Sequence, residues 1–376
     1  MTVRRVILAI HLWMGLCAAL FLALLGITGS LMVFENEIDR ALNPKLTWIR
    51  PGDHYLSLAE VKARLERRNP GYTIAGLAFS PRKEIAWDAF LQSKTSQRGM
   101  GIAFNPFTGD ILGDEAQRND FMNKVHQLHL RLLAGSAGAT VVSVAAVFLL
   151  FLSTSGTVLW WRRKILAPNW RNAPKKLNFD VHQALGIYSS FFLMIFSVTA
   201  LVIHWEGQAT FVANRLTHSP EAPPFPAAQQ PLPGAIPLSP DRLLAIAERS
   251  VPGAQATMMQ LAGSPIRIAM KYPEDGTPAG RTNVFLDPYT GKVVYLLSSR
   301  TGPLGFRIVK LWNREIHTGD IGGLSTRILA CAISLSLPVL AFTGPLIWWN
   351  RRSKPKSQSP IKSSAVADAT ASSKYS

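Results

Sequence analysis

Histidines are the residues of this sequence whose type and spacing could support chemistry, because imidazole binds metals and exchanges protons near neutral pH. The chain has eight: His11, His54, His126, His129, His182, His204, His218 and His317. We expect His11 and His182 to lie about one turn inside the first ends of the first and third membrane helices. An ionisable side chain at that depth of a membrane helix costs free energy unless it has a partner. For one isolated histidine, a bond to a neighbouring helix or a position at the membrane interface is the simpler interpretation, so it matters whether the two are related.

An internal duplication relates them. Aligning His11 with His182 also aligns Gly15 with Gly186 without a gap, and such self-similarity indicates a repeated structural unit. The other matched landmarks are Glu35 with Glu206, His129 with His317, Gly156 with Gly344, Trp160 and Trp161 with Trp348 and Trp349, Arg163 with Arg351, and Asn105-Pro-Phe-Thr-Gly109 with Asp287-Pro-Tyr-Thr-Gly291. Each half is thus a helix, an outer segment and a second helix. Because both halves enter the membrane with the same polarity, we expect a pseudo-two-fold axis along the membrane normal.

The expected depths of the first matched pair, His11 and His182, suit ligation of a haem. Two symmetry-related imidazoles at equal depth in a helix bundle can bind haem iron from opposite faces, and bundle cores are where such cofactors are held. Gly15 and Gly186 follow their histidines by four residues and share their helical face, where a missing side chain leaves room for a flat porphyrin. We therefore predict that His11 and His182 are the axial ligands of a b-type haem.

His129 and His317 form a second matched pair, at the outer ends of the second and fourth apolar runs. From His129 to the end of its Trp-Trp pair is 32 residues, which is about 48 Å of straight helix and more than a hydrocarbon core of about 30 Å. Glycines after each histidine therefore predict a break, with a short surface segment before the span. This pair could hold a second haem near the outer face, with Arg131, Arg314 or Arg327 as bidentate partners of the propionates.

Two other histidines leave the outer assignment open. His204 lies near the outer end of the third apolar run, and His126 precedes the first member of the outer pair by three residues. Neither has a histidine counterpart in the repeat, and either could replace a member of the outer pair. His54 and His218 lie in polar segments, where an ordinary surface position is the simpler interpretation. The sequence contains no convincing nucleophile or general base, so no catalytic residue is assigned.

Four long apolar runs must position these histidines, at residues 6–34, 137–161, 183–205 and 324–349. About 20 apolar residues suffice to cross the membrane, so each run predicts a spanning helix. The first run is longer than the usual signal-peptide core of about 7–15 residues, and no A-x-A site closes it. We therefore interpret it as a retained helix.

The formal net charge of +17 is concentrated beside these helices. Basic residues crowd the connection between the second and third runs and follow the fourth: Arg162, Arg163, Lys164, Arg171, Lys175, Lys176, Arg351, Arg352, Lys354 and Lys356. Such charge in short loops marks the cytoplasmic side, so we expect both termini in the cytoplasm and the outer segments in the periplasm. Because the charges lie beside membrane helices, we expect membrane lipid rather than nucleic acid as the partner.

Cys17 and Cys331 lie inside apolar runs, where they fit packing rather than a disulfide, and no C-x-x-C-H haem attachment motif exists.

The expected fold class is a membrane α-helical protein with four transmembrane helices in two parallel repeats and two periplasmic α+β domains. The expected order is transmembrane helix 1 at 6–34, outer domain 1 at 35–130, a surface segment with helix 2 at 131–161, a basic cytoplasmic loop at 162–181, helix 3 at 182–206, a proline-rich linker with outer domain 2 at 207–317, helix 4 at 318–350 and a polar cytoplasmic tail at 351–376.

The outer segments have a readable pattern of their own. Ser57 and Glu60 form a capping-box pattern that opens an amphipathic helix ending near Asn69. Alternating and apolar stretches then predict strands near 72–80, 84–92, 100–105 and 110–112, and in the second half a helix over 239–250 with strands near 256–262, 265–271 and 282–287. Residues 219–240 are rich in proline and predict an extended linker.

These motifs resemble a known family. A helix and several strands that end in D/N-P-x-T-G, placed between membrane helices, look like the PepSY domain. The flanking helices, with a histidine before a glycine and T/S-G-x-x-x-W-W at the exit, resemble PepSY-associated membrane helices over nearly the whole chain. Within that family the sequence is most similar to iron-regulated membrane proteins that include ferric-siderophore reductases.

The resemblance implies an oxidoreductase of the bacterial inner membrane that carries haem b, in one or two copies, and reduces a periplasmic ferric siderophore. Some relatives carry a fused flavin reductase domain, which is lacking here, so a quinol or a separate cytoplasmic reductase would donate the electrons. One alternative is a non-enzymatic PepSY envelope protein that binds or restrains a protease or another partner. A transporter is a further alternative, but four spans without a pair of short interrupted segments argue against it.

Overall fold

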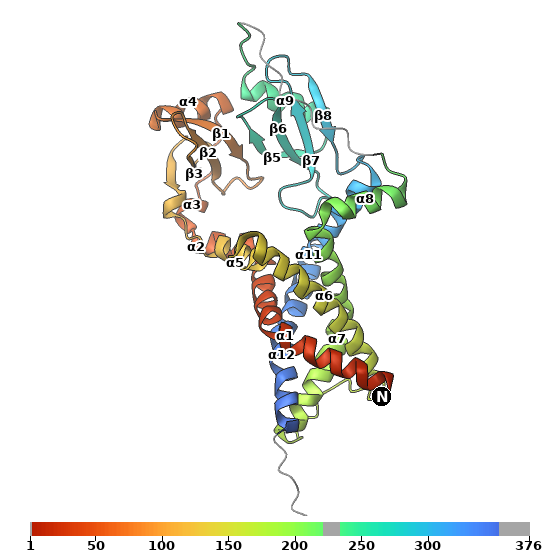
Figure 1. Cartoon of the computed structure of the whole chain (residues 1–376). Helices are drawn as coiled ribbons and strands as arrows, with labels where there is room; N and C mark the ends of the chain where they lie inside the picture. The colour runs from red at the N-terminus through yellow and green to blue at the C-terminus, as the bar shows by residue number, and fades with distance from the viewer. Residues whose placement is uncertain (1, 221–233, 353–376) are drawn as a thin grey trace, which may run out of the picture.

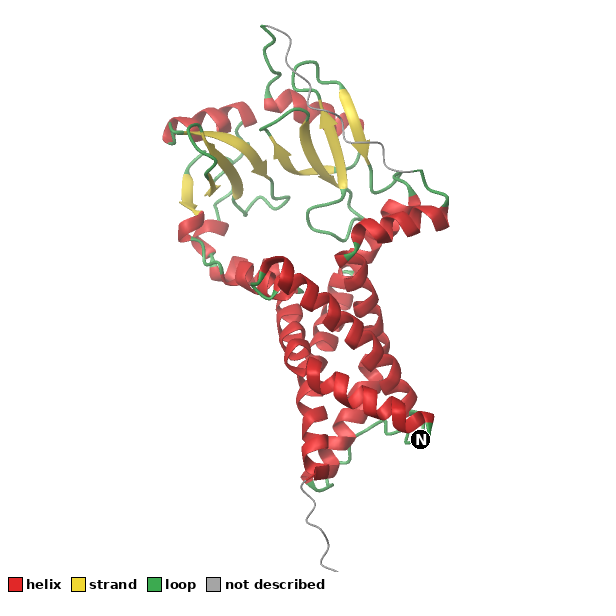
Figure 2. Cartoon of the chain, viewed as in Figure 1, coloured by secondary structure: helices red, strands yellow, loops and turns green. Residues whose placement is uncertain are grey.

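The computed structural model describes residues 2–220 and 234–352, which form a helical stalk with a β-sheet above one end (Figures 1 and 2). Most of the predicted linker and the predicted tail from residue 353 lie outside the described residues.

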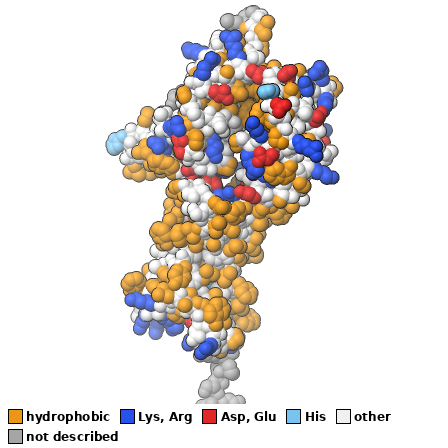
Figure 3. Space-filling model, turned by 180° about the vertical axis from the view of Figure 1, so that it is seen from behind, with side chains coloured by type: hydrophobic (Ala, Val, Ile, Leu, Met, Phe, Trp, Pro, Cys, Tyr) orange, Lys and Arg blue, Asp and Glu red, His pale blue; other side chains and the backbone are white. Residues whose placement is uncertain are grey.

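Four helices of the stalk are long and apolar enough to cross a membrane, as the four apolar runs predicted. They are α1 (Val3–Met32), α6 (Gly135–Trp160), α7 (Pro174–His204) and α12 (Leu324–Arg352). Hydrophobic side chains cover the middle of the stalk, and basic ones gather near the end distant from the sheet (Figure 3). α7 begins inside the segment 162–181 that was predicted as a loop, because Pro174 is pre-organised for the first turn of a helix.

The four long helices form a ring. α1 packs against α6 and α12, and α7 packs against the same two helices, so α1 and α7 lie diagonally across the bundle. α1 and α12 approach closely at Gly26, where an added Cβ would lie 2.6 Å from the carbonyl oxygen of Ser334. The two helices that carry His11 and His182 therefore face each other across the bundle interior.

A short helix and a sharp break precede both α6 and α12, as the glycine spacing predicted. α5 (Phe121–Arg131) ends in two residues of left-handed conformation, Leu132 and Leu133, before α6 begins. α11 (Asn313–Thr318) follows a π-helical turn, η2 (Arg307–Trp312), and ends at Gly319 with φ +81°. His129 lies on α5 and His317 on α11, so the outer histidines sit on separate short helices rather than on the spans.

Eight strands of the described residues form one antiparallel sheet in the order β4-β3-β2-β1-β5-β6-β7-β8. They are β1 (Tyr72–Ala78), β2 (Trp87–Ser93), β3 (Gly99–Phe104), β4 (Ile111–Asp114), β5 (Gln255–Gln260), β6 (Ile266–Lys271), β7 (Thr282–Leu286) and β8 (Val293–Leu297). β1 pairs with β5, with Leu77 opposite Met259. The two outer domains expected from the sequence are therefore halves of one continuous sheet.

Two amphipathic helices cover one face of this sheet. α4 (Leu58–Arg68) begins with the predicted capping box, and α9 (Pro240–Ser250) is its counterpart. Apolar side chains of both helices pack in one hydrophobic core with residues from both halves of the sheet. A side chain of α9 also caps the first turn of α4 and so joins the two halves. The Asp241 carboxylate accepts hydrogen bonds from the backbone N–H groups of Leu58 and Ala59, at 2.7 and 3.0 Å.

Short elements connect the sheet to the stalk, and the sequence patterns did not predict them. They are α2 (Glu35–Leu42), α3 (Pro44–Thr47), η1 (Glu115–Gln117), α8 (Glu206–Thr217), α10 (Leu304–Phe306) and η3 (Asp320–Gly322).

Candidate functional site

His11 and His182 line the same cavity inside the helix bundle. The cavity has a volume of about 630 Å³, within the range of about 300–1,000 Å³ that is usual for ligand sites. Four glycines, two from each half of the repeat, also line it: Gly15, Gly156, Gly186 and Gly344. An added Cβ at Gly15 would have only Leu152 near it, at 3.7 Å, so this wall of the cavity has space for a flat ligand.

A hydroxyl group of a neighbouring helix holds each of these two imidazoles. His11 Nδ1 lies 2.8 Å from Ser155 Oγ on α6, and His182 Nδ1 lies 2.8 Å from Thr343 Oγ1 on α12. Each hydroxyl also lies 2.7 or 2.8 Å from the carbonyl oxygen four residues earlier in its own helix. A hydroxyl has one proton to donate, and the carbonyl accepts it, so the hydroxyl must accept its other hydrogen bond from Nδ1–H.

This bonding favours, for both rings, the tautomer with its proton on Nδ1. With the proton on Nδ1, the lone pair is on Nε2, which is the form of histidine that ligates a metal. A second hydrogen bond that fixes ring orientation is also what metal-ligating histidines usually have. Both rings of this pair therefore present Nε2 as an acceptor, from helices on opposite sides of one cavity.

The outer pair repeats this arrangement. His129 Nδ1 lies 2.9 Å from Thr28 Oγ1 on α1, and His317 Nδ1 lies 2.9 Å from Thr199 Oγ1 on α7. Both threonine hydroxyls lie 2.8 Å from the carbonyl oxygen four residues earlier in their helices. By the same argument these imidazoles carry their proton on Nδ1 and keep Nε2 as an acceptor.

The two histidine layers lie at different depths of the bundle. Thr28 comes 17 residues after His11, which corresponds to about 26 Å along α1. Thr199 comes the same number of residues after His182 on α7. The pseudo-symmetry of the repeat therefore extends to the spacing between the layers.

The repeat in the sequence pointed to the four histidines, but the four hydroxyl partners were not predicted. A signal was present: Thr28 aligns with Thr199 in the same register that aligns His11 with His182. Similarly, the alignment of His129 with His317 places Ser155 on Thr343. Matched hydroxyl residues inside apolar runs were the observation that would have found them.

The other histidines have different surroundings. His204 is exposed at the last residue of α7, with its ring centroid 5.4 Å from that of Trp205. His126 Nδ1 lies 3.2 Å from a carboxylate oxygen of Glu35. His54 and His218 are exposed. None of these has the hydroxyl-bonded arrangement of the two matched pairs.

The arginines expected near the outer pair have other surroundings. Arg327 donates to both carboxylate oxygens of Glu37, at 2.8 Å, and to the carbonyl oxygen of Val33. This hydrogen-bonded guanidinium lowers the pKa of the Glu37 carboxyl. Arg131 and Arg314 are exposed on α5 and α11. The role of these arginines toward propionates stays a prediction.

Four basic residues that were not predicted to contact a cofactor line the inner cavity: Arg4, Arg5, Arg163 and Arg351. They come from three helix ends at the part of the stalk distant from the sheet, where Trp160 and Trp348 also line the cavity. The carboxylate groups of a ligand could pair with these guanidiniums, because the planar guanidinium group matches the geometry of a carboxylate.

The comparison with known families agrees with this architecture. The family described as "PepSY-associated TM region" matches residues 8–351, so the chain belongs to that family. No curated protein matches the sequence.

Proposed function

We propose that this member of the PepSY-associated family is a haem-containing oxidoreductase of the bacterial inner membrane, which passes electrons to a periplasmic ferric siderophore. The observation that carries the proposal is the repeated histidine pair. Each imidazole of both pairs has Nδ1–H bonded to a hydroxyl of an adjacent long helix, which leaves Nε2 available. Two such pairs at two depths support two b-type haems.

The residues of the inner cavity fit a bis-histidine haem. His11 and His182 would supply the axial nitrogens from diagonal helices, and the glycines would leave space beside them. Arginines at the cavity end would neutralise the propionates. When bound, haem supplies reversible one-electron chemistry at a potential set by axial ligands, burial and hydrogen bonding. The apolar lining around the pair would exclude water from it.

The second matched pair supports a path across the membrane. A hydrocarbon core of about 30 Å is far to cross in one electron transfer, and the two histidine layers divide it. The donor would be a quinol or a cytoplasmic reductase; a quinol gives up two electrons and two protons and would serve two chelates in turn. Each ferric chelate takes one electron and becomes ferrous, and the hard oxygen ligands of a siderophore then hold the iron less tightly. No protein nucleophile or general base is needed.

Charge distribution supports the proposed orientation. The segment between α6 and α7 contains Arg162, Arg163 and Lys164, and α12 ends in Arg351 and Arg352. Positive charge beside membrane helices favours the cytoplasmic side. The sheet would then face the periplasm.

The test is the dithionite-reduced minus oxidised spectrum of the purified full-length protein, with haem quantified per chain. We expect a b-type spectrum and about two haems per chain from the two matched pairs. His11→Ala and His129→Ala should each lose part of the spectrum, whereas the surface variant His54→Ala should keep all of it. A folded protein from haem-replete cells that is colourless would contradict the proposal and favour a non-enzymatic PepSY protein that binds or restrains a partner.

A further inference from the structure

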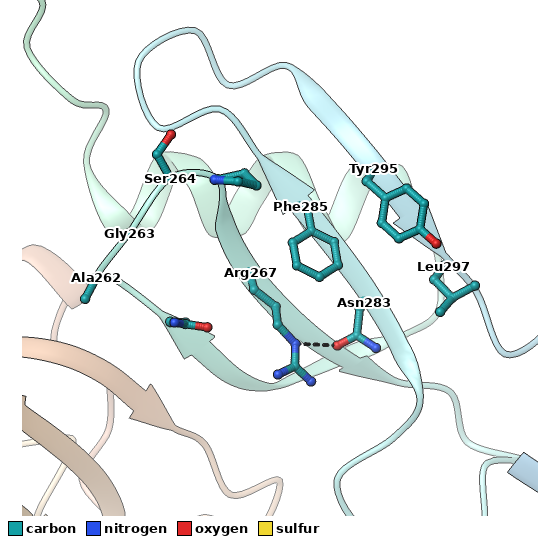
Figure 4. A pocket seen from close by; sticks show the side chains of 10 residues that line it. Ala262, Gly263, Ser264, Arg267, Asn283, Phe285, Tyr295 and Leu297 are labelled. Atoms are coloured by element: carbon teal, nitrogen blue, oxygen red, sulfur yellow. Dashed lines mark hydrogen bonds between the residues drawn. The ribbon is translucent and has the colours of Figure 1, made fainter. Parts of the chain in front are cut away.

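A second cavity lies on the face of the sheet that α4 and α9 do not cover. It has a volume of about 590 Å³ and is formed in the second half of the sheet, beside the loop between β5 and β6. Its polar and aromatic lining includes Arg267 on β6, Asn283 and Phe285 on β7, and Tyr295 on β8 (Figure 4). Phe285 and Tyr295 lie with their ring centroids 5.6 Å apart.

Arg267 presents part of its guanidinium to this cavity. Its Nε donates to Asn283 Oδ1 at 2.7 Å, which fixes the plane of the group. Its terminal nitrogens point away from Phe285 in the close view (Figure 4), and no acceptor within the described ranges takes a hydrogen bond from them. An oriented guanidinium of this kind is suited to bidentate contact with an anion.

Arg281 extends the basic character of the same face. Side chains alternate along a strand, so residue 281, just before β7, shares the face of Asn283 and Phe285. Arg281 Nε is buried and has no hydrogen-bond partner among the residues that the structure describes. Burial lowers the pKa of Arg281, and so do the nearby guanidiniums of Arg314 and Arg267, against the opposing carboxylates of Glu206 and Glu315.

The basic face leads from the cavity to the outer histidine pair. Arg314 lies on α11, three residues before His317. Arg267, Arg281 and Arg314 therefore mark a continuous route from the sheet to the short helix that holds one outer imidazole. Three guanidiniums against the two nearby carboxylates of Glu206 and Glu315 leave a net positive charge, which would favour an anion.

We propose that this cavity is the docking site for an anionic ferric chelate, with carboxylate or catecholate donors, in preference to a neutral or cationic one. Arg267 would contact its oxygen atoms, and the guanidinium of Arg281, which lies near that of Arg267, would add positive charge beside the cavity. This inference rests on the proposed function for the identity of the metal complex. The site itself is defined by charge and shape and does not require haem.

The experiment is calorimetric titration of the full-length protein in detergent with redox-inert gallium(III) complexes. An anionic gallium tris(catecholate) and a cationic gallium trihydroxamate are compared. The anionic complex should bind, and Arg267→Gln should weaken its affinity about 10- to 100-fold, the loss expected for one charge-assisted contact. Arg281→Gln should weaken it less, because Arg281 does not line the cavity. Arg98→Gln is the matched control, because Arg98 is an exposed arginine on the other half of the sheet; its affinity should stay within about twofold, since an exposed charge outside the site contributes little.

Arg267→Lys separates charge from geometry, and we expect it to bind with intermediate affinity because lysine lacks the fork. Equal binding of the two gallium complexes, or unchanged affinity in Arg267→Gln, would overturn the docking site. Since gallium accepts no electron here, that result would leave the redox proposal standing. Conversely, a colourless protein that still selects the anionic complex would contradict the redox proposal alone.

Discussion

At the scale of single residues, the hydroxyl partners decide what the histidines can do. A neutral imidazole can carry its proton on either nitrogen. Ser155 and Thr343 remove that freedom by accepting from Nδ1 at 2.8 Å while donating to their own helices. The same reasoning applies to the threonines that hold the outer pair. The hydroxyls therefore favour a free lone pair on Nε2 of each ring, which the proposed haem sites require.

Thr343→Val tests this role, because valine has a similar shape but cannot accept the imidazole proton. We expect the haem affinity of the inner site to fall about 10- to 100-fold, the usual cost of losing a partner of a metal-ligating histidine. Haem titration of the apoprotein measures it. Thr154→Val is the control, since Thr154 is an exposed residue on α6 that does not line the cavity. Equal affinities in the two variants would show that the hydroxyl does not position the ligand.

The sequence predicted the histidine pairs because the repeat aligns them, but it could not predict how each ring is held. A serine or threonine in a membrane helix usually bonds its own helix, so nothing local marks the ones that also hold an imidazole. The pairing of Arg327 with Glu37 was equally hidden, since 290 residues separate them. The sequence presents Arg327 as a cation near the outer pair, whereas the structure gives it a carboxylate partner.

At the scale of helices and strands, glycines have two different roles in the bundle. Gly15 lines the inner cavity, and an added Cβ would only touch Leu152 at 3.7 Å. Gly26 lies where α1 crosses α12, and an added Cβ would be 2.6 Å from a backbone oxygen and 2.7 Å from Leu337 Cβ. The first glycine leaves room for a ligand, and the second allows two helices to approach.

Gly26→Ala and Gly15→Ala should therefore differ in stability. Overpacking usually costs about 1–3 kcal/mol, and we expect Gly26→Ala to lower the free energy of unfolding by that amount because backbone must move. Gly15→Ala should leave it unchanged or slightly raised, since alanine favours helix. Thermal unfolding in detergent, followed by tryptophan fluorescence, compares the two. A loss of stability in Gly15→Ala as large as in Gly26→Ala would contradict the distinction.

Glu315 connects the sheet to the helix that carries His317. Its carboxylate is buried and accepts from the backbone N–H groups of Gly276 and Thr277, at 2.8 and 3.2 Å. Burial raises the pKa of this carboxyl, while the two N–H donors act in the opposite direction. The loop between β6 and β7 is thus tied to α11 immediately before the outer imidazole.

Glu315→Ala should release this loop, because it leaves two N–H groups without their acceptor at a cost of about 1–3 kcal/mol. Amide hydrogen exchange at Gly276 and Thr277 should become faster, with the inner haem retained. The comparison is Glu274→Ala, which removes an exposed partner of Arg300 on the same loop. Unchanged exchange in Glu315→Ala would mean that the contact does not hold the loop.

Local pattern predicted most of the strands and both covering helices, because capping, alternation and Pro-x-Thr-Gly turns are local signals. The pairing of β1 with β5 was not predictable in this way. It joins residues about 180 positions apart, such as Leu77 and Met259, and no turn connects them. α2 and α8 were also missed, since they continue from the spanning helices through a change of direction that depends on tertiary packing.

At the scale of the whole molecule, the repeat yields one pseudo-symmetric body. Its two halves share a sheet through β1 and β5, and they contribute diagonal helices α1 and α7 to one bundle. A sheet at one end and basic residues at the other give the molecule a polarity along the stalk (Figures 1 and 3). The proposed transfer of electrons from one side of a membrane to the other requires such a polarity.

Cysteine labelling tests the orientation. Ser96→Cys places a thiol on the sheet, and Asn169→Cys places one between α6 and α7; both positions are exposed. A membrane-impermeant maleimide should label Ser96→Cys in intact spheroplasts and Asn169→Cys only after lysis. The parent protein, with Cys17 and Cys331 inside the spanning helices, measures the background. The reverse pattern of labelling would place the sheet in the cytoplasm and contradict the proposed direction of electron flow.

The most direct test of electron transfer across the membrane uses the haem-loaded protein in liposomes. The liposomes enclose dithionite, and the external solution contains a ferric chelate with a dye that absorbs only when it binds ferrous iron. We predict that ferrous iron appears outside protein-containing liposomes, and that His11→Ala and His129→Ala reduce its rate of formation toward that of empty liposomes. Formation of ferrous iron at the protein-free rate, by intact liposomes whose protein carries both haems, would contradict the proposed function.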